Sequence, residues 1–124
     1  MDTKQVGEKL VALCREGRNL DAVNTLYSPD IVSVEAMQNG PMPAEQRGID
    51  AIRAKNQWWM ENHEVHSSST DGPYPNGDRF TVKYHYDITP KTGPMSGQRV
   101  SMDEVALYTV ANGKIVREEF FYAM

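Results

Sequence analysis

The stretch 99–122, RVSMDEVALYTVANGKIVREEFFY, is typical of two β-strands joined by a tight turn. Asn112 and Gly113 both tolerate the positive φ that a type I′ turn requires, and this pair between two strand-like runs is the strongest short-range signal for a hairpin. We expect the hairpin to complete a sheet. Acidic residues are depleted in strands, except where they face solvent or perform chemistry. Four of them stand inside this hairpin: Asp103, Glu104, Glu118 and Glu119.

The composition is that of an ordinary globular protein. The 124 residues, 40% hydrophobic and 24% charged, suffice for one domain over 1–124 with one core and one pocket. The net charge is −4 and the 13 basic residues form no run, so we expect neither nucleic acid nor a membrane as a partner. No apolar run approaches the ~20 residues of a membrane span. Cys14 is the only cysteine, which favours a reducing compartment, so we expect a cytoplasmic protein.

Helical periodicity and strand-like runs alternate along the rest of the chain. The predicted order is three helices interleaved with one strand, followed by four consecutive strands joined mostly by turns. Asn19 is expected to cap the second helix, and Pro29 prevents its continuation. The helices are predicted over 3–16, 19–28 and 48–62, the strands before the hairpin over 31–36, 63–70 and 80–88, and the main turns over 71–78 and 91–97.

Five segments, which together span nearly the whole chain, carry a family resemblance. They are LDAVNTLYSPDIV at 20–32, GIDAIRA at 48–54, GDRFTV at 77–82, GQRV at 97–100 and NGKIVREE at 112–119. In this order they resemble the nuclear-transport-factor-2-like (NTF2-like) superfamily, especially its SnoaL-like branch, which also includes ketosteroid isomerases and limonene-epoxide-hydrolase-like enzymes. The resemblance implies an α+β fold of the NTF2-like or cystatin-like kind: a curved antiparallel β-sheet packed on three N-terminal helices, cone-shaped, with a pocket at the open end.

Glu35 is the first candidate for chemistry. Counted from the matching Tyr27 and Asp30, it falls where the resemblance places the general-base carboxylate of the isomerases. Burial in an apolar pocket raises the pKa of a carboxyl group and makes it a better proton acceptor near neutral pH. The alternative is an acid at a strand end that faces solvent.

Classical steroid isomerisation is not expected. That reaction needs a hydroxyl group and a protonated acid to stabilise the developing enolate oxygen. The resemblance places Val11 and Val105 at the two positions, and neither side chain donates a hydrogen bond.

Asp103 and Glu118 are a second pair of candidates. If Val105 faces the pocket, the two-residue period of a strand sends Asp103 the same way, and on the last strand it groups Glu118 with Phe120 and Tyr122. Carboxyl groups sharing a pocket repel one another, so at least one would stay protonated and serve acid–base chemistry. The alternative is that these acids pair across the sheet with basic side chains: Arg99, Arg117 or Lys83.

His85 lies on the strand face opposite Tyr84 and Tyr86. It is a possible proton carrier if that face forms the pocket wall, and otherwise a surface or structural histidine. His63 and His66 are three apart, which in a strand places them on opposite faces, so we expect no metal site. We expect no other cofactor.

A ligand pocket would draw on the aromatic residues. Trp59 continues the helical stripe of Asn56, which supplies a polar group, while Phe120 and Tyr122 come from the last strand. Ordinary core packing uses the same residues. Tyr84 and Tyr86, if they lie on the convex face, form an exposed patch that predicts a homodimer through the sheet.

Two functions follow from these expectations. The first is a protein that binds a small, mostly apolar organic molecule and performs cofactor-free acid–base chemistry on it as an isomerase, cyclase or hydrolase. The second is a non-enzymatic dimeric ligand-binding or protein-interaction module, whose acids are solvated or ion-paired.

Overall fold

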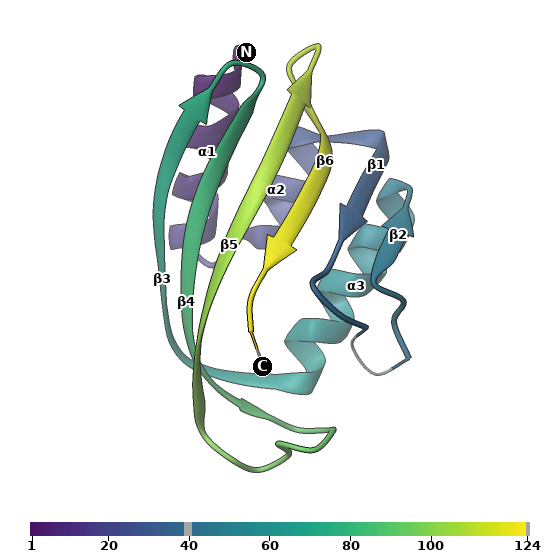
Figure 1. Ribbon diagram of the computed structural model, residues 1–124, viewed down its shortest axis with the longest axis vertical. Coiled ribbons are helices and arrows are strands. Elements are labelled where there is room, and N and C mark those ends of the chain that lie inside the picture. Colours follow the sequence, from purple (N-terminus) through teal and green to yellow (C-terminus); the bar gives the residue numbers. More distant parts are fainter. Residues whose placement is uncertain (39–40, 124) are drawn as a thin grey trace.

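The computed structural model describes residues 1–38 and 41–123, and it confirms the expected α+β fold. Three helices pack against a six-stranded curved sheet with the strand order β2-β1-β6-β5-β4-β3, in which all neighbours are antiparallel except β1 and β6. Figure 1 shows the sheet in front, with α1 and α2 behind it. The elements are α1 Thr3–Arg15, α2 Asn19–Leu26, β1 Tyr27–Val34, β2 Glu45–Arg47, α3 Ile49–Asn62, β3 His63–Asn76, β4 Arg79–Pro90, β5 Val100–Ala111 and β6 Lys114–Phe121.

The helix starts differ in part from the predicted ones. Asp2 caps α1 through a capping box: Asp2 Oδ1 accepts from the backbone N–H of Gln5 at 2.8 Å, and Gln5 Oε1 accepts from the backbone N–H of Asp2 at 3.0 Å. Asn19 is not the cap of α2, because Arg18 holds the N-cap position without a side-chain hydrogen bond. None of the helices in the described ranges is long and apolar enough to span a membrane.

The closing hairpin has the predicted turn and an unpredicted bulge. Asn112 and Gly113 have φ values of 53° and 76°, as a type I′ turn requires. Thr109 pairs with Arg117 and the next residue of β5 pairs with Ile115, so the residue between those two on β6, Val116, is extra. Such a bulge shifts the alternation of side chains between the faces of a strand. Ile115 is therefore fully buried, although the simple two-residue period groups Val116 with the inward residues.

Strand β3 has 14 residues, where the predicted strand over 63–70 has eight. The turn predicted over 71–78 is wrong for most of its length, because 74–76 pair with 79–81 of β4 and the reversal occurs at Gly77 and Asp78. Two register irregularities, between Val65 and Ser67 and between Asp71 and Tyr74, interrupt the ladder. Short β2 was not predicted; it lies antiparallel to β1 at the sheet edge.

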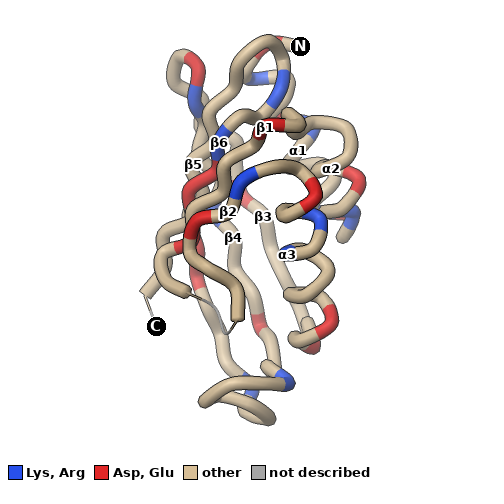
Figure 2. The backbone as a smooth tube through the Cα atoms, turned by 90° about the vertical axis from the view of Figure 1, so that its right-hand side faces the viewer, with Lys and Arg blue, Asp and Glu red and all other residues tan. Residues whose placement is uncertain are grey.

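The hydrophobic core lies between the helices and the sheet face that they cover, which we call the inner face. Phe80 and Tyr108 stack there with ring centroids 4.9 Å apart, and residues such as Leu10, Val82 and Ala106 are buried around them. The opposite, outer face carries most of the charged residues of the sheet. Figure 2 shows basic and acidic residues intermixed along the described backbone rather than gathered in one basic segment.

Candidate functional site

A cavity of about 320 Å³ opens between the helices and the inner face of the sheet. Its wall is aromatic and apolar, with a small number of charged and polar side chains among the rings, a composition typical of small-molecule sites. The charged members are Glu35, Lys55, Glu104 and Glu118, and the aromatic members are Tyr27, Trp59, Tyr84, Tyr86, Tyr108 and Phe120.

The tyrosines of β4 belong to this wall. Tyr84 is 4% exposed, and its hydroxyl lies 2.7 Å from the hydroxyl of Tyr108. Tyr86 packs against Trp59 of α3 with ring centroids 5.2 Å apart. The prediction that Tyr84 and Tyr86 form an exposed patch on the convex face is therefore wrong: the helices cover the aromatic side of β4.

Glu118 is the most deeply buried acid in the site, with 2% of its surface exposed. Its Oε2 accepts a short hydrogen bond from the hydroxyl of Tyr27, and its Oε1 accepts one from Ser33 Oγ at 2.8 Å. Both donors come from β1, which lies beside β6 in the sheet. These two hydrogen bonds replace the water that the carboxylate loses on burial.

Lys55 links the acids, and the sequence analysis missed it. Its Nζ donates to Ser33 Oγ at 2.8 Å and lies 3.4 Å from Oε2 of Glu35. The same ammonium sits over the ring of Phe120, 4.6 Å from the centroid, which is cation–π geometry. The helical spacing of the sequence could have identified Lys55. It follows Ile52 by three residues and precedes Trp59 by four, so all three lie on the face of α3 that is turned toward the core.

Glu35 follows directly on β1 and faces the cavity. Its side chain is 12% exposed, and burial raises its pKa above the usual value. The positive charge of Lys55 opposes this shift, while the negative charge of Glu118 adds to it. Glu35 is thus a carboxyl group with a raised pKa and an ammonium partner.

Glu104 is the second functional candidate that the sequence analysis missed. It is the cross-strand neighbour of Tyr84 and lines the cavity. Burial raises the pKa of Glu104 to about 8; the charges of Glu35 and Glu118 also raise it, and Lys55 opposes them. No hydrogen bond from a described side chain contributes to this shift. A carboxyl group with this pKa is present in both protonation states near neutral pH.

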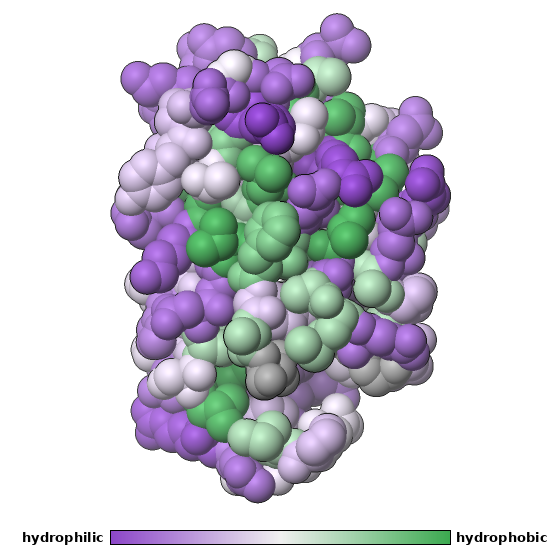
Figure 3. Space-filling view, in the orientation of Figure 1, coloured by the Kyte–Doolittle hydropathy of each residue, from purple (hydrophilic) through white to green (hydrophobic). Residues whose placement is uncertain are grey.

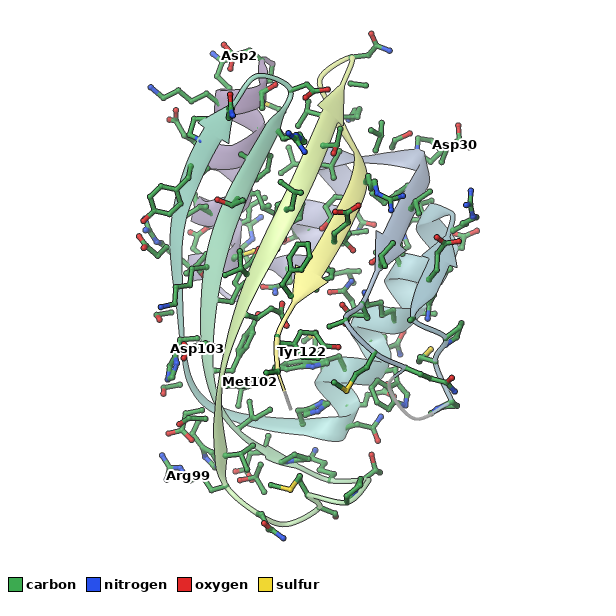
Figure 4. The ribbon with its side chains drawn as sticks, viewed as in Figure 1. Asp2, Asp30, Arg99, Met102, Asp103 and Tyr122 are labelled. Carbon is green, nitrogen blue, oxygen red and sulfur yellow. The ribbon has the colours of Figure 1, made fainter. Side chains whose placement is uncertain are left out.

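Asp103 lies outside the cavity, so its predicted orientation is wrong (Figure 4). Its Oδ1 lies 2.8 Å from Nδ1 of His85 on the outer face, and this hydrogen bond lowers the pKa of Asp103. The predicted alternation of β5 is shifted by one residue, because it assigned the odd-numbered side chains, Asp103 among them, to the pocket. The even-numbered residues of β5, such as Ala106, point into the core, and Val105 is 40% exposed. Cross-strand pairing was the stated alternative for Asp103, but the partner is His85.

His85 does lie opposite the aromatic stripe, as predicted from the alternation, but that face is not the cavity wall. Of the two positions compared with the isomerases, Val11 is buried in the core and Val105 faces outward. The cavity residue on this part of β5 is instead Glu104.

Three of the four expected ligand-binding residues line the cavity: Asn56, Trp59 and Phe120. The Nδ2 of Asn56 donates to the backbone carbonyl of Ile52 at 2.9 Å. Trp59 stacks on His63, with centroids 4.5 Å apart and planes 17° apart. Tyr122 follows the last residue of β6 and is not among the residues lining the cavity (Figure 4).

Within the described ranges, no cluster of three or more His, Cys, Asp or Glu side chains has the arrangement of a metal site. His66 Nε2 instead lies 2.7 Å from Thr89 Oγ1, and His63 Nδ1 lies 2.8 Å from the backbone carbonyl of Trp59.

Comparison with solved structures finds proteins described as SnoaL-like, NTF2-like and cystatin-like. A protein from Mesorhizobium loti, named provisionally as a SnoaL-like polyketide cyclase and carbohydrate phosphatase, is 47% identical over 98% of this chain and 100% of its own, with a TM-score of 0.91. An NTF2-like protein from Burkholderia thailandensis is 20% identical over 99% of this chain and 92% of its own, with a TM-score of 0.81.

A hypothetical protein with a ketosteroid isomerase-like fold from Catenulispora acidiphila, solved in complex with trimethylamine, is also similar. It is 20% identical over 98% of this chain and 88% of its own, with a TM-score of 0.73. These two more distant likenesses show the shared fold alone. No significant match to a curated protein is found. The model of the SnoaL-like domain matches residues 1–122, and the chain therefore belongs to the SnoaL-like family.

Proposed function

We propose that this SnoaL-like protein binds a small organic molecule in the cavity and transfers protons on it with its own side chains, as a cofactor-free isomerase, cyclase or hydrolase. The observation that carries the proposal is the enclosure of three carboxyl groups and one ammonium by an aromatic wall. Buried ionisable groups are costly unless they are paired, and they gather where chemistry needs shifted pKa values.

The acids take different roles in this proposal. Glu118 is held by Tyr27 and Ser33 and acts as a fixed negative charge. Glu35, beside Lys55, is the proposed base. The sequence predicted Asp103 as the acid that exchanges a proton with the ligand. We assign this role to Glu104 instead, because Glu104 lines the cavity and has a pKa of about 8. Two carboxyl groups with separated pKa values can act as a base and an acid at the same pH.

The provisional name of the Mesorhizobium loti protein agrees with chemistry of this kind. Cyclisation of a polyketide requires removal of a proton from a carbon next to a carbonyl group, together with a proton donor for the developing oxyanion. A basic carboxylate and a protonated carboxyl group facing one cavity supply both functions.

Proton abstraction is tested by hydrogen–deuterium exchange in a panel of small aromatic and alicyclic ketones, followed by NMR in D₂O. We expect the protein to accelerate exchange next to the carbonyl of at least one ketone. Glu104→Gln should reduce that rate by about a hundredfold, in the range of one acid–base group. Asp103→Asn is the matched control, one residue away on the outer face. If the protein accelerates none of them, the enzymatic proposal is wrong and a non-enzymatic binding module takes its place.

We also propose a cytoplasmic location, on the basis of the single Cys14, and a homodimer through the outer face of the sheet. Tyr84 and Tyr86 cannot form this interface, because they line the cavity on the inner face. The proposed interface is centred on Val105 and Phe121, which are direct cross-strand partners and are 40% and 54% exposed. Figure 3 shows apolar residues gathered at the centre of this face of the molecule, and an apolar patch rimmed by polar residues usually marks an interface.

A further inference from the structure

The charges of the cavity do not balance. Three carboxyl groups face one ammonium, and that ammonium is already engaged: Lys55 pairs with Glu35 and reaches Glu118 through Ser33. Within the described part of the chain, no ion pair is present at Glu104. When Glu104 is ionised, the wall therefore carries an excess of negative charge in a partly buried site, where a complementary positive charge is favoured.

The rings around this charge are suited to a cation. Aromatic faces attract ammonium groups through their quadrupoles, and the attraction grows when the cation is desolvated. The wall already holds one ammonium in this way, since Lys55 lies over Phe120. Tyr86 and Trp59 are tilted by 51° to each other near Glu104, whose charge acts on Tyr86. Because Trp59, Tyr86 and Glu104 all line the cavity, an alkylammonium group there would meet both aromatic surface and a counter-charge.

We propose that the cavity binds a small organic cation, an amine or a quaternary ammonium compound, with the carboxylate of Glu104 as its counter-ion. This inference rests on the part of the proposed function that places a small organic ligand in the cavity, and it specifies the class of that ligand. With a cation bound, Glu104 is ionised, so it serves as the counter-ion and as a proton acceptor rather than as the acid. An anionic ligand would meet three carboxyl groups and an ammonium that is already paired. A neutral ligand would leave Glu104 protonated, so it is the alternative against which the cation has to be tested.

Binding of a cation is then coupled to the loss of one proton. The titratable groups that face Glu104 from the surrounding elements are Glu35, Lys55, Glu118, Tyr84, Tyr86, Tyr108, Tyr27 and Cys14. Burial raises the pKa of every one of these tyrosines above its usual value, and it raises the pKa of Cys14 to about 11, so these five groups stay neutral below pH 9. Glu104 is the carboxyl group here with a pKa of about 8, so we expect a change in cation affinity between pH 7 and pH 9 to come from it, and the Glu104→Gln variant tests that assignment.

Choline and its neutral carbon isostere, 3,3-dimethylbutan-1-ol, are the probes. They have the same shape, and neither titrates in this range, so any pH dependence belongs to the protein. We expect isothermal titration calorimetry or NMR titration to show choline binding at least about tenfold more tightly than the alcohol at pH 9. Its affinity should fall about tenfold from pH 9 to pH 7, as a group with a pKa of about 8 takes up its proton. The affinity of the alcohol should not change.

Glu104→Gln keeps the shape of the side chain and removes the charge. It should weaken choline about tenfold at pH 9, abolish the pH dependence and leave the alcohol unaffected. Asp103→Asn should behave as the wild-type protein, since its side chain lies on the outer face. Equal binding of the two probes, binding of neither, or equal losses in the two variants overturns the inference. The pH series on the wild-type protein decides the question even if a variant folds poorly.

Failure here is separable from failure of the proposed function. Ketone exchange without preference for choline would leave proton transfer standing and exclude the cationic ligand class. Preference for choline without ketone exchange would identify a cation-binding cavity in which proton transfer on ketones does not occur.

Discussion

Lys55 Nζ lies 3.4 Å from Oε2 of Glu35, and both side chains are largely buried, with exposures of 14% and 12%. The pair joins the middle of α3 to the end of β1 and, through Ser33, to the carboxylate of Glu118. One ammonium therefore anchors two carboxyl groups at the wall of the cavity. Removing one partner of such a pair leaves the other as an uncompensated buried charge.

Replacing Lys55 by Met should lower the free energy of unfolding by about 3 kcal/mol at pH 8. The cost should be smaller at pH 5 than at pH 8, because burial raises the pKa of Glu35, loss of the Lys55 charge raises it further, and a lower pH favours the uncharged carboxyl group. Urea denaturation at the two pH values measures the difference. Combining the change with Glu35→Gln should restore part of the loss; a double variant as unstable as the sum of the two single variants would show that the two groups do not interact.

Glu104→Gln should stabilise the protein at alkaline pH. The folded state holds its proton up to a pKa of about 8, whereas the unfolded chain releases it near the usual value of 4.5, so the folded state binds more protons between these values. Wild-type stability therefore falls as pH rises through this window, and it stops falling above pH 8. The glutamine variant lacks this loss and should be more stable by up to about 5 kcal/mol at pH 8.5, since each pKa unit corresponds to about 1.4 kcal/mol, and nearly equal at pH 4.5. Denaturation curves with the same pH slope for both proteins would contradict the prediction.

Tyr27→Phe should destabilise the protein by about 2 kcal/mol, because Glu118 stays buried and loses one of its two donors. Chemical denaturation measures the change. Tyr74→Phe is a matched control: Tyr74 also donates to a carboxylate, Asp71, but both side chains are exposed, so the free energy of unfolding should not change measurably. Similar losses in the two variants would show that the burial of Glu118 is not what makes its hydrogen bonds important.

Phe121→Asp should abolish the proposed dimer. A charge within the apolar patch of Val105 and Phe121 on the outer face would be desolvated in an interface, yet it costs little on the free surface. Sedimentation velocity over a range of concentrations should detect dimers for the wild-type protein and monomers for the variant. Ser101→Asp, exposed on the same face of β5 but away from the Val105–Phe121 pair, is the control. A wild-type protein that stays monomeric throughout would remove this part of the proposal.

Local patterns predicted most of the secondary structure because each depends on a few neighbouring residues. The type I′ turn at Asn112–Gly113 follows from the positive φ that these residues tolerate. The third helix follows from its apolar periodicity, and its stripe also contained Asn56 and Trp59, which line the cavity. The length of β3 was underestimated because Gly72 and Pro73 are typical of turns, yet here they lie within a strand at an irregularity of its ladder.

The sequence by itself determined the order of the helices and of every strand but β2, the hairpin, and a small set of acids and aromatic residues, because side-chain alternation and helical periodicity are properties of single segments. Only the tertiary structure decided which side of each strand is covered. Alternation separates Asp103 from Glu104 but does not say which of them faces the helices, and packing of α1 and α3 on the even-numbered side selected Glu104. The place of Lys55 in the site likewise depends on the packing of α3 beside β1. Lys55 contacts Ser33 and Glu35, which lie 22 and 20 residues earlier in the chain.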